Sequence, residues 1–73
     1  MKVKVNYSLL QKKQTGKDQE EFYADSIKQL IIKIKKKHPR FSEEDHEIII
    51  NGEKTKQLKE DCIVAFLPVV LGG

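Results

Sequence analysis

The sequence lacks the features that mark several classes of protein. It contains a single cysteine, Cys62, which excludes an internal disulfide and a zinc site built from cysteines alone. Its apolar runs are far too short to cross a membrane. Residues 1–6 alternate polar and apolar side chains, whereas a signal peptide would open an apolar segment there. We therefore expect a soluble, cytoplasmic protein that works in a reducing compartment, with no membrane association.

The chain also lacks size. Its 73 residues are enough for one domain, and a chain this short buries only about 60% of its unfolded surface when it folds. The apolar fraction of 38% suffices for one small core. A pocket for a drug-sized ligand takes several hundred Å³, which is difficult to build within so little protein. We therefore expect a protein that works by docking to partners and not a self-contained enzyme.

The net charge of +3 comes from a mixed surface. The densest basic stretch consists of Lys33, Lys35, Lys36, Lys37 and Arg40. Acidic residues gather at residues 20–21 and 43–47. A helix that ends within the basic stretch would be stabilised by cations near its negative end. Binding of nucleic acid is the alternative from a different functional class, but no aromatic side chains for base stacking interleave with these lysines.

One amphipathic helix is predicted over residues 27–37. Ser26 and Gln29 have the spacing of a capping box, in which each side chain binds a backbone N–H at the helix start. The apolar residues recur at the helical spacing of three and four, which places them on one face; they are Ile27, Leu30, Ile31 and Ile34. Pro39 ends the helix because its ring is incompatible with the preceding turn.

Five strands are predicted around that helix. Residues 2–10 alternate polar and apolar side chains, as a half-buried strand does, and residues 20–24 return after a turn that contains Gly16. Residues 46–50 and 54–57 flank Asn51-Gly52, a pair typical of a type I′ hairpin. Residues 63–67 are continuously apolar, which favours a central strand buried on both faces or nearly so. We expect Pro68 to end the pairing, because proline has no backbone N–H to donate.

The predicted order is strand, strand, helix and three further strands. Such a chain is an α+β domain in which one amphipathic helix crosses a small mixed sheet. The long connection between the first and last strands permits them to be parallel neighbours in the centre.

Two segments of the chain resemble a known family. The hairpin at residues 48–53 and the ending at residues 58–73 are similar to the β-grasp, ubiquitin-like sulfur carriers of the MoaD and ThiS type, and most of all to MoaD, the small subunit of molybdopterin synthase. The MoaD ending has the form L-x-D-G-D-E-V-A-F-F-P-P-V-x-G-G. The coinciding residues are Leu58, Val64, Ala65, Phe66, Pro68, Val70, Gly72 and Gly73. Asp61 and Cys62 depart from its Gly-Asp pair, and Val69 replaces its second proline.

The resemblance implies a chemistry at the chain's last residue. In this family a ubiquitin-activating-type adenylyltransferase uses ATP to adenylate the C-terminal carboxylate, here that of Gly73, which then becomes a thiocarboxylate. Gly72, which has no Cβ, would help the tail thread a narrow channel. The sulfur then goes to molybdopterin in the large subunit of molybdopterin synthase. The carrier itself is a non-catalytic co-substrate with no bound cofactor. The alternatives are a carrier for the thiazole of thiamin or for tRNA thiolation, and a ubiquitin-like protein modifier.

The expected partner-binding residues lie next to this tail. They are Phe66, Leu67, Pro68, Val69, Val70 and Leu71. Phe66 and Leu67 point to opposite faces of a strand, so one of the two is expected in the core and the other on the surface. We divide the chain into a β-grasp domain over residues 1–70 and a flexible tail over residues 71–73. No metal site is expected, because His38 and His46 lie in unlike settings with no third ligand suitably spaced.

Overall fold

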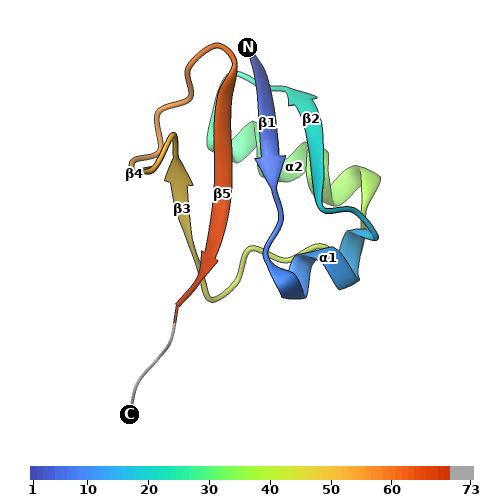
Figure 1. The fold of residues 1–73 in the computed structure, drawn as a ribbon. Coiled ribbons are helices and arrows are strands. Elements are labelled where there is room, and N and C mark those ends of the chain that lie inside the picture. Colours follow the sequence, from blue (N-terminus) through green and yellow to red (C-terminus); the bar gives the residue numbers. More distant parts are fainter. Residues whose placement is uncertain (70–73) are drawn as a thin grey trace.

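A computed structural model describes residues 1–69 of the chain (Figure 1). Its five-stranded sheet has the order β2-β1-β5-β3-β4. The strands are β1 (Lys2–Asn6), β2 (Gln19–Tyr23), β3 (His46–Ile50), β4 (Glu53–Lys54) and β5 (Cys62–Pro68). β1 and β5 are parallel neighbours in the centre, as expected, and the other pairs are antiparallel. No helix within residues 1–69 is long and apolar enough to span a membrane.

The structure contains a helix that the sequence pattern did not predict. β1 ends at Asn6, and α1 (Leu9–Thr15) follows, so the prediction of a strand up to residue 10 and of a single helix is wrong. Ser8 caps α1 through a complete capping box: its Oγ accepts from the backbone N–H of Gln11, and Gln11 Oε1 accepts from the N–H of Ser8. Gly16, with φ of 75°, closes the helix in the left-handed conformation. The caps at both ends define this short helix, which carries no apolar repeat.

The predicted amphipathic helix is confirmed as α2 (Ile27–Lys37), which lies behind the sheet (Figure 1). Its face towards the sheet buries Ile27, Leu30 and Ile34. The N-terminal cap differs in one detail from the expected capping box. Ser26 Oγ accepts from the Gln29 N–H at 3.1 Å, but Gln29 Oε1 binds the N–H of Asp25, one residue earlier.

Within residues 1–69, helices cover one face of the sheet and leave the other uncovered. β5 alternates buried and exposed residues, so the prediction that residues 63–67 are buried on both faces is wrong. Ile63 and Leu67 keep 44% and 49% of their surface exposed. An apolar run therefore does not decide whether a strand is covered on both faces, because that depends on where the helices pack. The core lies between the covered face and α2.

The hairpin between β3 and β4 forms at the predicted turn. Asn51 and Gly52 both have positive φ, of 50° and 82°. β4 spans only two residues, so the predicted strand over residues 54–57 is wrong: pairing begins at Glu53 and ends at Lys54. Asp61, at the position where the MoaD pattern has glycine, adopts φ of 59° in the turn before β5. It takes the left-handed backbone conformation that favours glycine.

Candidate docking surface and C-terminal tail

The base of the C-terminal tail is held at one end of the sheet. Pro68, the last residue of β5, lies opposite His46 of β3. One residue later the N–H of Val69 donates to the carbonyl oxygen of Asp45 at 2.7 Å. The strand pairing thus ends at Pro68, as predicted, and one further backbone hydrogen bond holds the next residue. The predicted site residues Val70, Leu71, Gly72 and Gly73 lie outside the described residues.

His46 connects this end of the sheet to α1. Its Nδ1 lies 2.7 Å from the carbonyl oxygen of Glu44, which can only accept, so Nδ1 carries a proton. Its Nε2 lies 2.8 Å from the hydroxyl of Ser8, the residue that caps α1. The imidazole ring also packs edge-on against Phe66, with 6.5 Å between ring centroids. The base of the tail, β3 and the start of α1 thus form one connected frame.

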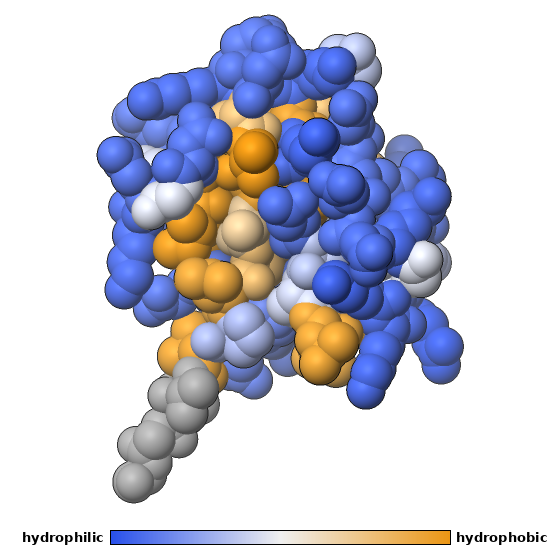
Figure 2. All heavy atoms as spheres, viewed as in Figure 1, coloured by the Kyte–Doolittle hydropathy of each residue, from blue (hydrophilic) through white to orange (hydrophobic). Residues whose placement is uncertain are grey.

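An apolar stripe lies on the uncovered face of the sheet and runs along β5 to the end of that strand (Figure 2). Its residues on β5 are Ile63, Ala65 and Leu67, which alternate with the buried positions. Ile49 of β3 pairs with Ala65 and therefore shares this face, whereas Glu47, opposite Leu67, places a carboxylate at its border. We call Ile49, Ile63, Ala65 and Leu67 the sheet-face stripe. An exposed apolar stripe with a polar border is typical of a protein-binding surface.

Phe66 does not belong to the stripe. Only 2% of its surface is exposed, and its ring packs against Phe41 in a T-shaped contact with centroids 5.5 Å apart. The expectation that Phe66 and Leu67 point to opposite faces is confirmed. The inclusion of Phe66 among partner-contacting residues is corrected, because its side chain lies in the core. Leu67 and Pro68 are exposed and Val69 is partly buried.

Sequence reasoning missed a second apolar surface, on α1. Leu9 is 72% exposed and Leu10 is also exposed. Figure 2 shows an apolar patch in the region of α1, separated from the stripe by polar atoms. The predicted strand over residues 2–10 includes both leucines and therefore does not indicate a separate apolar surface there. The spacing of Ser8 and Gln11, which is the same as that of Ser26 and Gln29, was the available signal.

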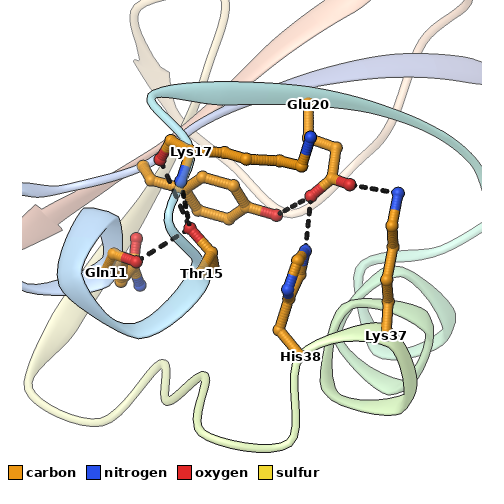
Figure 3. A network of polar contacts seen from close by, with 7 residues as sticks. Gln11, Thr15, Lys17, Glu20, Lys37 and His38 are labelled. Atoms are coloured by element: carbon orange, nitrogen blue, oxygen red, sulfur yellow. Dashed lines mark hydrogen bonds and ion pairs between the residues drawn. The ribbon is translucent and has the colours of Figure 1, made fainter.

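Part of the basic stretch serves a buried network and is not free for a ligand (Figure 3). Glu20 Oε1 accepts from the hydroxyl of Tyr7 at 2.9 Å and from Nε2 of His38 at 2.8 Å. The Lys37 ammonium forms an ion pair with Oε2. Burial raises the pKa of Glu20, but hydrogen bonds from Lys37, His38 and Tyr7 outweigh it and hold that pKa below its usual value. Burial raises the pKa of the Tyr7 hydroxyl, and the hydrogen bond to Glu20 and the negative charge of Glu20 raise it further.

Two further lysines of the stretch also have partners within the chain. Lys33 donates to the carbonyl oxygen of Tyr23, and Lys35 lies 3.0 Å from the carboxylate of Glu43. These contacts account for their positions without nucleic acid. Cys62 is fully buried in the core, which fits a structural thiol.

The comparisons with known proteins identify the family. The ThiS family model matches residues 3–73. The chain belongs to the ThiS family. Among solved structures, a protein assigned as molybdopterin converting factor subunit 1 from Pyrococcus furiosus is 30% identical, with a TM-score of 0.82 over 96% of this chain and 99% of that one. No curated protein matches the sequence.

Two further solved structures share the fold of this ThiS-family chain. One is small archaeal modifier protein 1 from Methanosarcina acetivorans, 18% identical, with a TM-score of 0.78 over 99% of this chain and 96% of that one. The other, from Helicobacter pylori, is a complex of subunits 1 and 2 of molybdopterin-converting factor; the matched chain is 23% identical, with a TM-score of 0.70 and full coverage of both chains. The predicted β-grasp fold and the MoaD and ThiS resemblance are confirmed.

Proposed function

We propose that this chain is a sulfur carrier that is adenylated and then thiocarboxylated at Gly73, and that it donates its sulfur in molybdopterin biosynthesis. The observation that carries the proposal is the diglycine at residues 72–73, which follows β5 and the apolar residues 69–71 in a ThiS-family chain. The 30% identity to a molybdopterin converting factor subunit over nearly the whole chain supports molybdopterin as the destination.

The chemistry explains why a partner is required. A C-terminal carboxylate has a pKa near 3.3–3.7 and is ionised at neutral pH, which makes it a poor electrophile. Attack of one carboxylate oxygen on the α-phosphorus of ATP releases pyrophosphate and leaves an acyl adenylate. A sulfide then attacks the acyl carbon, AMP departs with one of the two carboxylate oxygens, and sulfur takes that oxygen's place. A persulfide donor gives an acyl disulfide instead, and a thiol must then cleave its S–S bond to release the thiocarboxylate.

In this scheme the chain supplies binding and reach, and its partners supply catalysis. Ordering the tail in an active site costs about 1–2 kcal/mol of backbone entropy per residue. Docking of the sheet-face stripe offsets that cost, because each apolar side chain buried fully is worth about 1.5–3 kcal/mol. Leu67 is best placed for this role, since it lies two residues before Val69 and is exposed beside the base of the tail.

Two partners are implied in turn, an ATP-dependent adenylyltransferase and the large subunit of molybdopterin synthase. The Helicobacter pylori complex, in which a protein of the same fold is paired with subunit 2, supports the second. A large partner that encloses the tail explains why a chain with so small a core needs no pocket of its own.

Sulfur discharge tests the destination. The thiocarboxylated chain is incubated with the large molybdopterin synthase subunit and its pterin precursor, and the mass of the carrier is followed. We expect the carrier to return to the carboxylate form while the pterin gains sulfur. If the carrier discharges only to a thiazole-forming enzyme, to a tRNA-thiolation enzyme, or to lysine side chains of other proteins, the molybdopterin assignment is wrong.

A further inference from the structure

An open groove lies on the α2 side of the sheet, away from the sheet-face stripe. It has a volume of about 600 Å³ and runs between α2 and β3. Its apolar lining comes from Ile27 and Ile31 on α2 and from Ile48 on β3. Ile32, also on α2, is 56% exposed at its border. Ile31, Ile32 and Ile48 therefore present aliphatic surface to solvent in one concave place, and the buried Ile27 lies behind them.

The groove exists because α2 does not cover the whole inner face of the sheet. Among the strands, α2 packs most closely against β2. β2 forms the edge of the sheet that is farther from β3. Ile48 alternates with Ile49 and so points to the core side, yet it is only partly buried. Ile31 on α2 is likewise packed against the core but only partly buried.

The adjacent sheet edge is also open. β4 pairs only with Ile49 and Ile50, so within residues 1–69 the earlier part of β3 has no strand partner on its outer side. A second, smaller hollow lies along this edge, lined by Glu47, Ile48 and Lys56. An extended segment can add to an unpaired strand edge while its alternate side chains enter a neighbouring groove.

The charges around the groove select the kind of segment. Lys28 and Lys56 line it, and neither takes part in any ion pair found within the described part of the chain. Glu43 also lines the groove, but it forms an ion pair with Lys35 at 3.0 Å, and Glu47 beside the groove forms one with Lys54 at 3.2 Å. The unmatched charge is therefore positive, and complementary charge favours an acidic partner.

We propose that this groove is a second protein-docking site, which takes an extended aliphatic segment flanked by aspartate or glutamate residues from a partner protein. The segment lies along the outer edge of β3, with its aliphatic side chains between Ile31 and Ile48 and its carboxylates near Lys28 and Lys56. Because Ile48 and Ile49 face opposite sides of the sheet, this site and the sheet-face stripe can be occupied at the same time. A second partner could thus hold the carrier while the tail is engaged elsewhere.

Binding of a synthetic peptide to the full chain tests this inference. The probe is a short peptide of alternating valine and isoleucine flanked by glutamates, and a version flanked by lysines is the comparison peptide. Calorimetry gives the affinity, and NMR shift mapping gives the place. We expect the glutamate peptide to bind with shifts at Ile31 and Ile48, and the lysine peptide to bind at least about tenfold more weakly.

Variants with matched controls separate this site from other surfaces. Ile32→Ser, and Lys28→Glu combined with Lys56→Glu, should each weaken binding of the glutamate peptide about tenfold or more. Ile63→Ser on the opposite face and Lys36→Glu on the same helix should leave binding unchanged. Absence of glutamate-peptide binding, or equal affinity in the groove variants, would overturn the proposal. So would a single-stranded RNA that binds more tightly and responds to the lysine changes but not to Ile32→Ser.

Discussion

Replacing Glu20 with glutamine should destabilise the fold strongly, although the two side chains have nearly the same shape. Glu20 lies on β2 and is buried. Its carboxylate binds Tyr7, which follows β1, and also Lys37 and His38 at the end of α2. A hydrogen bond to a charged group contributes about 1.5–3 kcal/mol, and Glu20 accepts such bonds from Tyr7 and His38 while its ion pair with Lys37 is partly exposed. Glutamine keeps one acceptor but loses the charge opposite Lys37, so we expect a loss of about 2–4 kcal/mol.

The pH dependence of stability gives this prediction its sign. The pKa of Glu20 is lower in the folded chain than in the unfolded chain. The unfolded chain therefore binds the proton more readily, and the stabilisation is complete above the unfolded pKa, near 4.3. It is lost as pH falls from there through the folded value. Glu20→Gln lacks this contribution at every pH and should lose less stability than the parent on acidification.

Urea denaturation from neutral to acidic pH measures both effects. Glu21→Gln is the matched control, because Glu21 neighbours Glu20 on β2 but its side chain is exposed and its ion pair with Lys2 lies at the surface. The control should change the free energy of unfolding at neutral pH by less than about 1 kcal/mol. Equal losses for the two variants, or an unchanged pH dependence in Glu20→Gln, would refute the account of the network.

Three further predictions concern the helices and the strand that leads to the tail. Leu30→Ala should cost about 2–5 kcal/mol in urea denaturation by leaving a cavity under α2, whereas Lys36→Ala on the exposed side should cost less than about 0.5 kcal/mol; similar losses would contradict the assigned face. Ser8→Ala should cost about 1 kcal/mol and raise amide hydrogen exchange in α1, because the capping box is lost; unchanged exchange would contradict the cap. Leu67→Ser should weaken affinity for the adenylyltransferase while the melting temperature stays close to the parent value, and Phe66→Ala should lower stability by about 3–5 kcal/mol; the reverse pattern would exchange their roles.

The parts of the fold that could be predicted from sequence are those with local signals. The spacing of the apolar residues around Leu30 indicates α2. The Asn51-Gly52 pair indicates the hairpin, because both residues readily adopt the positive φ that they have in the structure. α1 was missed because seven residues are too few for an apolar repeat to show, and its caps, not its face, mark it. The burial of β5 on one face only could not be read from its residues, since it depends on which side of the sheet the helix packs.

The candidate site divides in the same way. Alternation along a strand is local, so the opposite orientations of Phe66 and Leu67 were predictable. The exposure of Leu9 could be predicted only from a sequence signal for α1, the helix on which it lies. The contact of Glu20 with Lys37 and His38 joins residues far apart in the sequence, and nothing local indicates that part of the basic stretch neutralises a buried carboxylate.

Intact-protein mass spectrometry tests the central claim, that the Gly73 carboxylate is the reacting group. The full chain is incubated with a cognate adenylyltransferase, ATP and a sulfur source, beside one variant that lacks Gly73 and another that carries one extra residue after it. We expect only the parent to gain the mass of one sulfur in place of one oxygen, with the change mapped by fragmentation to Gly73. Circular dichroism should show that all three chains are folded. An equal mass gain in the chain that lacks Gly73 would contradict the sulfur-carrier account.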